Sequence, residues 1–186
     1  MGFGELLRQL RSAADQGFDF REIEDEIEYL AEFEAETSRA EALAFTGDAS
    51  MRVWALGLIG DARDLPIMVA ALDDPALRHT ALEAVGGQRD REPIDGIARA
   101  FLDDPDPGVR RQAASLVAWL RRPGYAEALL PLTRDTDQDV RSVITLRLAM
   151  HGDATAAPLL RIMLDDPVER IRRNAQRGLD RLSRPT

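Results

Sequence analysis

Residues 103–114 read Asp-Asp-Pro-Asp-Pro-Gly-Val-Arg-Arg-Gln-Ala-Ala, and the Val-Arg pair within them recurs along the 186-residue chain as an apolar residue followed by arginine. The recurring pairs are Met51-Arg52, Leu77-Arg78, Val109-Arg110, Val140-Arg141 and Ile171-Arg172. Successive arginines are 26, 32, 31 and 31 residues apart. A period in this range is typical of a solenoid, in which each unit stacks on its neighbours. The sequence therefore predicts a repeat architecture.

The residues around each recurring arginine predict an apolar helical stripe. The residue before the arginine is apolar, the third residue after it is Ala in four units and Ile144 in the other, and the seventh is Ile, Val or Leu. This i, i+4, i+8 spacing places the three positions on one face of a helix. A break such as Pro123-Gly124 follows, and then a second apolar stretch. Each unit is therefore expected to be a helical hairpin.

Aspartates mark the expected start of each first helix. Asp-Asp-Pro occurs three times, and we expect Asp104 and Asp166 to cap the helices that follow. A further aspartate stands four residues before four of the arginines, where an ion pair across one helical turn adds about 0.2–0.5 kcal/mol. The predicted structural ladder consists of Asp48 with Arg52, Asp74 with Arg78, Asp106 with Arg110 and Asp137 with Arg141.

These features resemble HEAT repeats, and specifically the short bacterial HEAT-like type that is also found in phycobilisome lyases. The resemblance covers about residues 48–182. It implies an all-α fold, a right-handed α-α superhelix of about four helical hairpins with a terminal capping helix. It also implies that the Asp and Arg of the ladder link adjacent repeats and that the second helices line the concave surface. The expected repeats are residues 48–73, 74–104, 105–135, 136–166 and a half repeat at 167–182.

Residues 1–47 are expected to form an acidic N-terminal helical cap, followed by the repeat domain at 48–186. Residues 19–41 hold ten acids and two bases, so nearly all of the formal charge of −9 lies there. Ser38 and Glu41 fit a capping box that opens a short helix. The like charges along the preceding helix repel one another, and a basic partner would relieve that repulsion. A solvated face that aids solubility is the alternative interpretation.

Composition argues against several classes of function. The chain has no Cys and two His, which leaves little material for a metal site, and we expect no cofactor and no catalytic group. A pI near 4.8 argues against nucleic-acid binding, despite a modestly basic C-terminal end. No apolar run is long enough to span a membrane, and the N-terminus lacks the pattern of a secretory signal, so a cytoplasmic protein is expected.

Seven residues are candidates for contact with a partner because they break the repeat or occupy polar positions of the second helices. Trp54 and Tyr125 are aromatic residues that either bind a partner or fill gaps between helices, and Arg99 and Arg161 occupy equivalent places in two repeats. The full set is Glu22, Glu26, Glu32, Trp54, Arg99, Tyr125 and Arg161.

The leading functional hypothesis is a non-enzymatic scaffold or adaptor that binds another protein along its concave face or through the acidic N-terminal hairpin. An inhibitor or immunity-type binder of a basic protein is a variant of this hypothesis. The alternative is a lyase-like or chaperone-like helper for a prosthetic group such as a bilin, which the resemblance alone implies.

Overall fold

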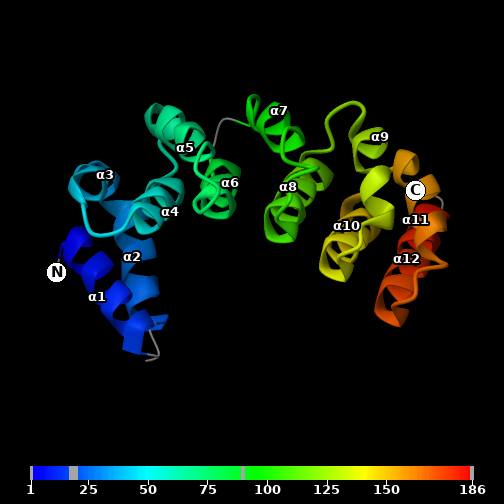
Figure 1. The fold of residues 1–186 in the computed structure, drawn as a ribbon, viewed down its shortest axis with the longest axis horizontal. Coiled ribbons are helices and arrows are strands. Elements are labelled where there is room, and N and C mark those ends of the chain that lie inside the picture. The colour runs from blue at the N-terminus through cyan, green and yellow to red at the C-terminus, as the bar shows by residue number, and fades with distance from the viewer. Residues whose placement is uncertain (1, 17–20, 89–90, 185–186) are drawn as a thin grey trace. The chain divides into compact units, whose positions relative to one another are not determined.

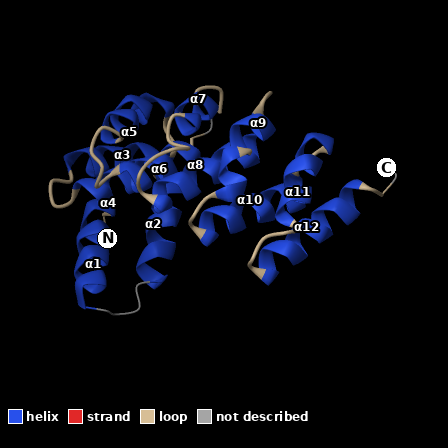
Figure 2. Ribbon diagram, turned by 45° about the vertical axis from the view of Figure 1, so that its right-hand side comes forward, coloured by secondary structure: helices blue, strands red, loops and turns tan. Residues whose placement is uncertain are grey.

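The computed structural model describes residues 2–16, 21–88 and 91–184. Every regular element within these residues is a helix (Figure 2). The chain divides into two compact units, Met1–Asp90 and Arg91–Thr186. The helices that precede the first repeat therefore share a compact unit with it, while the boundary between residues 47 and 48 stays a prediction.

The first unit begins with a group of three helices that pack on one another, after which α3 packs on α4 and α4 on α6 (Figure 1). Pro66 at the start of α5 suits the first helical turn, where no hydrogen-bond donor is lost. The elements are α1 (Phe3–Gln16), α2 (Arg21–Phe33), α3 (Ala35–Ala44), α4 (Ala49–Ile59), the 3₁₀ turn η1 (Ala62–Asp64), α5 (Leu65–Ala71) and α6 (Arg78–Gly86).

In the second unit, α8, α10 and α12 lie side by side as the first helices of successive repeats (Figure 1). Shorter second helices pack against them, with α7 on α8 and α11 on α12. The elements are α7 (Ile94–Arg99), α8 (Pro107–Leu120), α9 (Tyr125–Leu129), η2 (Pro131–Arg134), α10 (Gln138–His151), η3 (Ala154–Ala156), α11 (Ala157–Met163) and α12 (Glu169–Leu182). The helical solenoid predicted from the period is confirmed.

The apolar stripe predicted around each arginine forms the core of the repeats. Val140 and Ile171, which precede their arginines, are fully buried, and so is Leu148 at the seventh position of its unit. The third position is 0% exposed in every repeat, and the alanine found there in four of the five lets neighbouring helices approach closely. The residues at that position are Ala55, Ala81, Ala113, Ile144 and Ala175.

The predicted caps at Asp104 and Asp166 are wrong by two residues. The N-cap of α8 is Asp106, whose side chain accepts a hydrogen bond from the N–H of Gly108. Asp104 instead accepts the N–H of Asp106 at 2.8 Å, and Asp166 accepts that of Val168 at 2.8 Å. Each of these carboxylates therefore fixes the turn before the helix. Its remaining acceptor sites are available to other donors.

The capping box predicted at Ser38 is also wrong. Ser38 lies inside α3 and is 1% exposed, and its Oγ donates a hydrogen bond to the carbonyl oxygen of Leu30 at 3.0 Å. A buried hydroxyl needs a partner, and the carbonyl oxygen of Leu30 in the last turn of α2 supplies one in addition to accepting the N–H of Glu34 at 2.9 Å. The hydroxyl thus joins α3 to α2.

Candidate partner-binding site

Three arginine-aspartate ion pairs connect successive helical hairpins, one from the N-terminal cap to the first repeat and two between repeats, and each joins residues 25 positions apart. In the second unit, Arg110 donates two hydrogen bonds of 2.8 Å to Asp135, and Nε of Arg141 donates one of 2.7 Å to Asp166. Both aspartate side chains are at most 5% exposed. The pairs of this kind are Arg39 with Asp64, Arg110 with Asp135 and Arg141 with Asp166.

These pairs correct the predicted ladder, because the acids four residues before the arginines have other partners. Asp106 and Asp137 are helix N-caps, and their carboxylates accept backbone N–H groups. Asp48 caps α4 through Met51 and accepts a bond from Arg11, while Asp74 accepts the N–H of Ala76. These aspartates satisfy backbone N–H groups at the start of a helix, while Arg110 and Arg141 pair with the aspartate of the following repeat.

The electrostatics of the two second-unit pairs agree with their geometry. The pKa of Asp135 is lowered, first by its hydrogen bonds from Arg110 and despite its burial. Burial raises the pKa of Asp166, but hydrogen bonds from Arg141 and from the N–H of Val168 outweigh it and leave the pKa below its usual value. Both carboxylates are therefore held ionised between two arginine-bearing helices.

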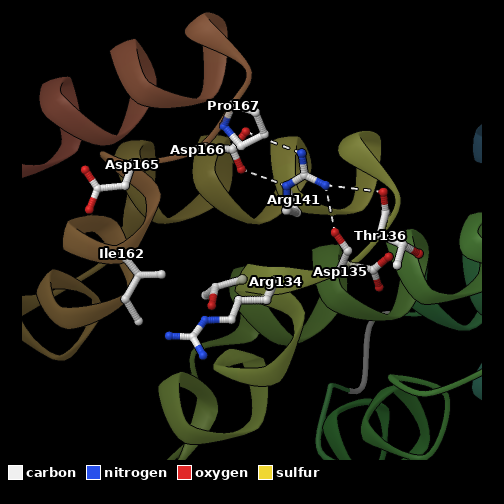
Figure 3. Close-up of a pocket in the computed structure, with 9 residues that line it drawn as sticks. Arg134, Asp135, Thr136, Arg141, Ile162, Asp165, Asp166 and Pro167 are labelled. Atoms are coloured by element: carbon white, nitrogen blue, oxygen red, sulfur yellow. Dashed lines mark hydrogen bonds and ion pairs between the residues drawn. The ribbon is translucent and has the colours of Figure 1, made fainter.

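Figure 3 shows the cavity beside the second pair, which has a volume of about 620 Å³. Arg141 lies on one side of it and is bonded to Asp166 and to the carbonyl oxygen of Asp135 at 2.7 Å. The exposed charged residues that line it are Arg134 and Asp165, which carry opposite charges. The cavity is thus dominated by groups that already hold the repeats together.

A groove in the first unit has a different character because it contains the predicted contact residue Trp54. This Trp54 groove has a volume of about 310 Å³ and is lined from α1, α2, α4 and α6. Trp54 is half-buried in it, while Glu24 of α2 and Glu83 of α6 add two carboxylates. The lining residues are Leu10, Arg11, Glu24, Asp48, Ser50, Met51, Trp54, Thr80 and Glu83.

The charges of the Trp54 groove do not cancel. Arg11 is bonded to Asp48, so these two charges offset each other. The hydroxyl groups of Ser50 and Thr80 lie 3.0 Å apart in a hydrogen bond that joins α4 to α6 beside the indole. Glu24 and Glu83 then remain, and the groove presents an aromatic surface with negative charge.

The predicted acidic contacts Glu22, Glu26 and Glu32 are all exposed on α2. Sequence reasoning missed their aromatic neighbours Tyr29 and Phe33, which are 57% and 64% exposed with ring centroids 4.8 Å apart. Their i, i+4 spacing beside the acids was the signal that identifies this pair. The helix therefore combines acids with exposed aromatic surface.

Two other predicted contacts have structural partners in the second unit. Arg99 donates to Asp95 at 2.6 Å and to the carbonyl oxygens of Pro123 and Gly124 at 3.1 and 3.2 Å. Tyr125 is 3% exposed, and its hydroxyl donates to Asp153 at 2.9 Å. The contacts of Arg99 fix the turn between α8 and α9, and the bond of Tyr125 joins α9 to the N-cap of η3. Because Tyr125 is buried, it is not part of an exposed contact surface.

The last predicted contact, Arg161, is exposed on α11. It does not line the Trp54 groove, which belongs to the first unit. No cluster of three or more potential metal ligands occurs among the residues that the structure describes.

Comparison with known proteins identifies the family. The sequence profile of HEAT repeats matches residues 69–145 and, in an overlapping placement, residues 94–180, which together cover more than half of the chain. The chain belongs to the HEAT-repeat family. At the general level, HEAT repeats indicate a protein-interaction scaffold.

The fold of this HEAT-repeat protein is also similar to a solved structure. That structure is the crystal structure of an engineered protein from the Northeast Structural Genomics Consortium, with a TM-score of 0.56, 18% sequence identity, and coverage of 97% of this chain and 87% of that chain. No curated protein matches the chain. None of the helices described in the structure is both long and apolar enough to cross a membrane.

We expect Tyr125→Phe to destabilise this HEAT-repeat protein modestly. The substitution removes the hydrogen bond to Asp153, which costs about 1 kcal/mol, while Asp153 keeps its bonds from Thr155. Thermal unfolding should show a melting temperature lower by about 2–4 °C. An unchanged melting temperature would show that the hydroxyl exchanges this bond for water at no cost.

Proposed function

We propose that this HEAT-repeat protein is a non-enzymatic scaffold that binds a basic segment of a partner protein in the Trp54 groove. The observation that carries this proposal is that the half-buried indole of Trp54 lines the same groove as Glu24 and Glu83, which come from two different helices. Membership of the HEAT-repeat family supports a general role as a scaffold, and the carboxylates of the groove support a positively charged partner.

An indole beside carboxylates favours a cation over a neutral side chain. The face of the indole attracts a guanidinium or ammonium group, and this attraction is worth about 0.5–2 kcal/mol. The second unit contains such a contact, in which the guanidinium carbon of Arg91 lies 3.8 Å from the ring centroid of Trp119. In the Trp54 groove, an arginine or lysine of a partner would take the corresponding place.

The exposed acids of α2 add a longer-range attraction. Glu22, Glu26 and Glu32 lie on the helix that also supplies Glu24 to the groove. A field of one sign raises the rate at which a basic segment associates, and salt screens it over about 10 Å at 0.1 M. Binding should therefore weaken as the ionic strength rises.

The test is a fluorescence titration of Trp54 in a Trp119→Phe background, with a panel of peptides that contain Arg and Lys. We expect basic peptides to change the Trp54 emission, and Trp54→Ala should weaken binding about thirtyfold, as measured by calorimetry. Glu24→Lys and Glu83→Lys should each weaken binding by about three- to tenfold because each reverses a charge at the groove.

The matched control is Glu127→Lys, which makes the same charge change at an exposed site on α9 in the second unit. It should leave the affinity within about twofold of the original. Equal binding of acidic peptides, or equal loss of affinity in Glu127→Lys, would contradict a charge-selective groove.

A further inference from the structure

The residue six positions before an arginine of the repeat can be compared between repeats, because its carbonyl oxygen accepts a hydrogen bond from that arginine. Four of the five recurring arginines, which we call anchor arginines, each donate a hydrogen bond to the carbonyl oxygen of the residue six positions earlier, at distances between 2.6 and 2.9 Å. Arg78 donates to Leu72, Arg110 to Asp104, Arg141 to Asp135 and Arg172 to Asp166. These four acceptor residues are therefore structurally equivalent.

The side chain at this position completes the ion pair with the preceding repeat. Asp135 pairs with Arg110, and Asp166 pairs with Arg141. In the repeat of Arg78, however, the position holds Leu72, which is 6% exposed and has no charge to offer. The preceding anchor, Arg52, thus lacks the carboxylate that its equivalents have.

Because Leu72 stands where the other repeats have an aspartate, the guanidinium of Arg52 is incompletely hydrogen-bonded. Its Nε is buried and has no hydrogen-bond partner in the part of the chain that the structure describes. A buried donor without an acceptor destabilises the folded state, and a charged donor does so more strongly. The deficit would be removed by any carboxylate that reached the guanidinium.

The surroundings of Arg52 leave room for such a group. Arg52 lines a cavity of about 450 Å³ in the first unit, together with Pro66, Ile67 and Leu77. Ile67 is 37% exposed, so the apolar wall of the cavity reaches the surface. A guanidinium with apolar walls suits a side chain that brings one carboxylate and apolar neighbours.

We propose that the cavity at Arg52 binds an Asp or Glu side chain of a partner protein, flanked by apolar residues. The incoming carboxylate takes the role that Asp135 and Asp166 play within the chain, and the partner thereby completes the interrupted ladder from outside. This site differs in position and in charge preference from the Trp54 groove, so the inference does not rest on the function proposed above.

The test uses the folded protein and a panel of capped hexapeptides with one central Asp or Glu between Leu, Ile and Pro residues. Each peptide has a matched version with Asn or Gln. We expect the Arg52 Nε–H signal in ¹⁵N NMR spectra, assigned by its loss in Arg52→Lys, to shift with the carboxylate peptides. Their affinity should exceed that of the amide versions at least tenfold.

Two variants and a control separate the outcomes. Arg52→Gln should abolish the preference for the carboxylate, and Leu72→Asp, which restores an internal carboxylate, should weaken binding at least tenfold. Arg8→Gln, which removes a charge from an exposed pair on α1, should leave binding unchanged. Should Leu72→Asp fail to fold, Arg52→Gln with the peptide pairs still decides the question.

Three results would overturn the proposal. If no peptide of the panel moved the Arg52 signal, the cavity would not take a carboxylate. If the amide versions bound equally well, the cavity would be a purely apolar site. If inorganic phosphate displaced the peptides at equal concentration, the site would be a general anion site. Binding that survived in Trp54→Ala would show that the result is independent of the Trp54 groove.

Discussion

Arg141→Met is expected to lower the free energy of unfolding by about 3–5 kcal/mol. The side chains of Arg141 and Asp166 are 10% and 3% exposed, so the substitution leaves an aspartate buried without its charged partner. Arg141 also donates to the carbonyl oxygens of Asp135 and Thr136, which lose a partner as well. Urea unfolding followed by circular dichroism measures the change.

The control for this substitution is Arg161→Met, which removes the same charge from an exposed position on α11. Its effect should lie within about 0.5 kcal/mol of zero. A double variant, Arg141→Met with Asp166→Leu, should recover part of the loss, because replacing both partners by apolar groups removes the buried charge. A loss below about 1 kcal/mol in Arg141→Met would show that water solvates Asp166.

Gly57→Ala is expected to destabilise the protein by about 1–3 kcal/mol, although alanine favours helices over glycine by about 1 kcal/mol. A Cβ at Gly57 would lie 2.4 Å from the Cα of Ala84 and 2.5 Å from its Cβ. The obstacle is backbone, so α4 and α6 must move apart to admit the methyl group. The overpacking therefore outweighs the helix propensity.

Gly96→Ala is the matched control, because Gly96 also lies in a helix but a Cβ there would meet nothing within 4 Å. Here the same substitution should raise stability by about 0.4–1 kcal/mol. Thermal unfolding of the two variants in one buffer gives opposite signs of the shift in melting temperature. A stabilising Gly57→Ala would mean that α4 and α6 adjust their spacing without cost.

The sequence predicted those parts of the fold that depend on periodicity. The apolar stripes that include Ala113 in α8 and Ile144 in α10 follow from the spacing of apolar residues within each helix, which is local information. The burial of both residues confirms the stripes. The break at Pro123-Gly124 likewise separates α8 from α9. The helical solenoid could therefore be inferred from the period of the arginines alone.

The partners of the arginines were not predicted correctly, because the nearer acid in the sequence was favoured over the correct one. Asp137 lies four residues before Arg141, yet it caps its own helix, while Asp166 lies 25 residues on. That separation recurs in three pairs, so a search for acids at a fixed longer spacing would have found it.

The candidate site was only partly accessible from sequence. Trp54 was identified because it breaks the repeat, and the structure places it in a groove. Glu83 lies 29 residues away on another helix, and no local pattern brings it beside Trp54. The partners of Arg99 are backbone carbonyl oxygens, which leave no mark in the sequence.

The double use of Asp135 has a consequence for how the second unit folds. Its carboxylate accepts the N–H of Asp137 in the turn that opens α10 and also binds Arg110 of α8. The carboxylate of Asp135 thus stabilises the start of one repeat and also binds the repeat before it. Neighbouring repeats are thereby coupled energetically, and a chain built this way should melt by the spreading of disorder from one repeat to the next.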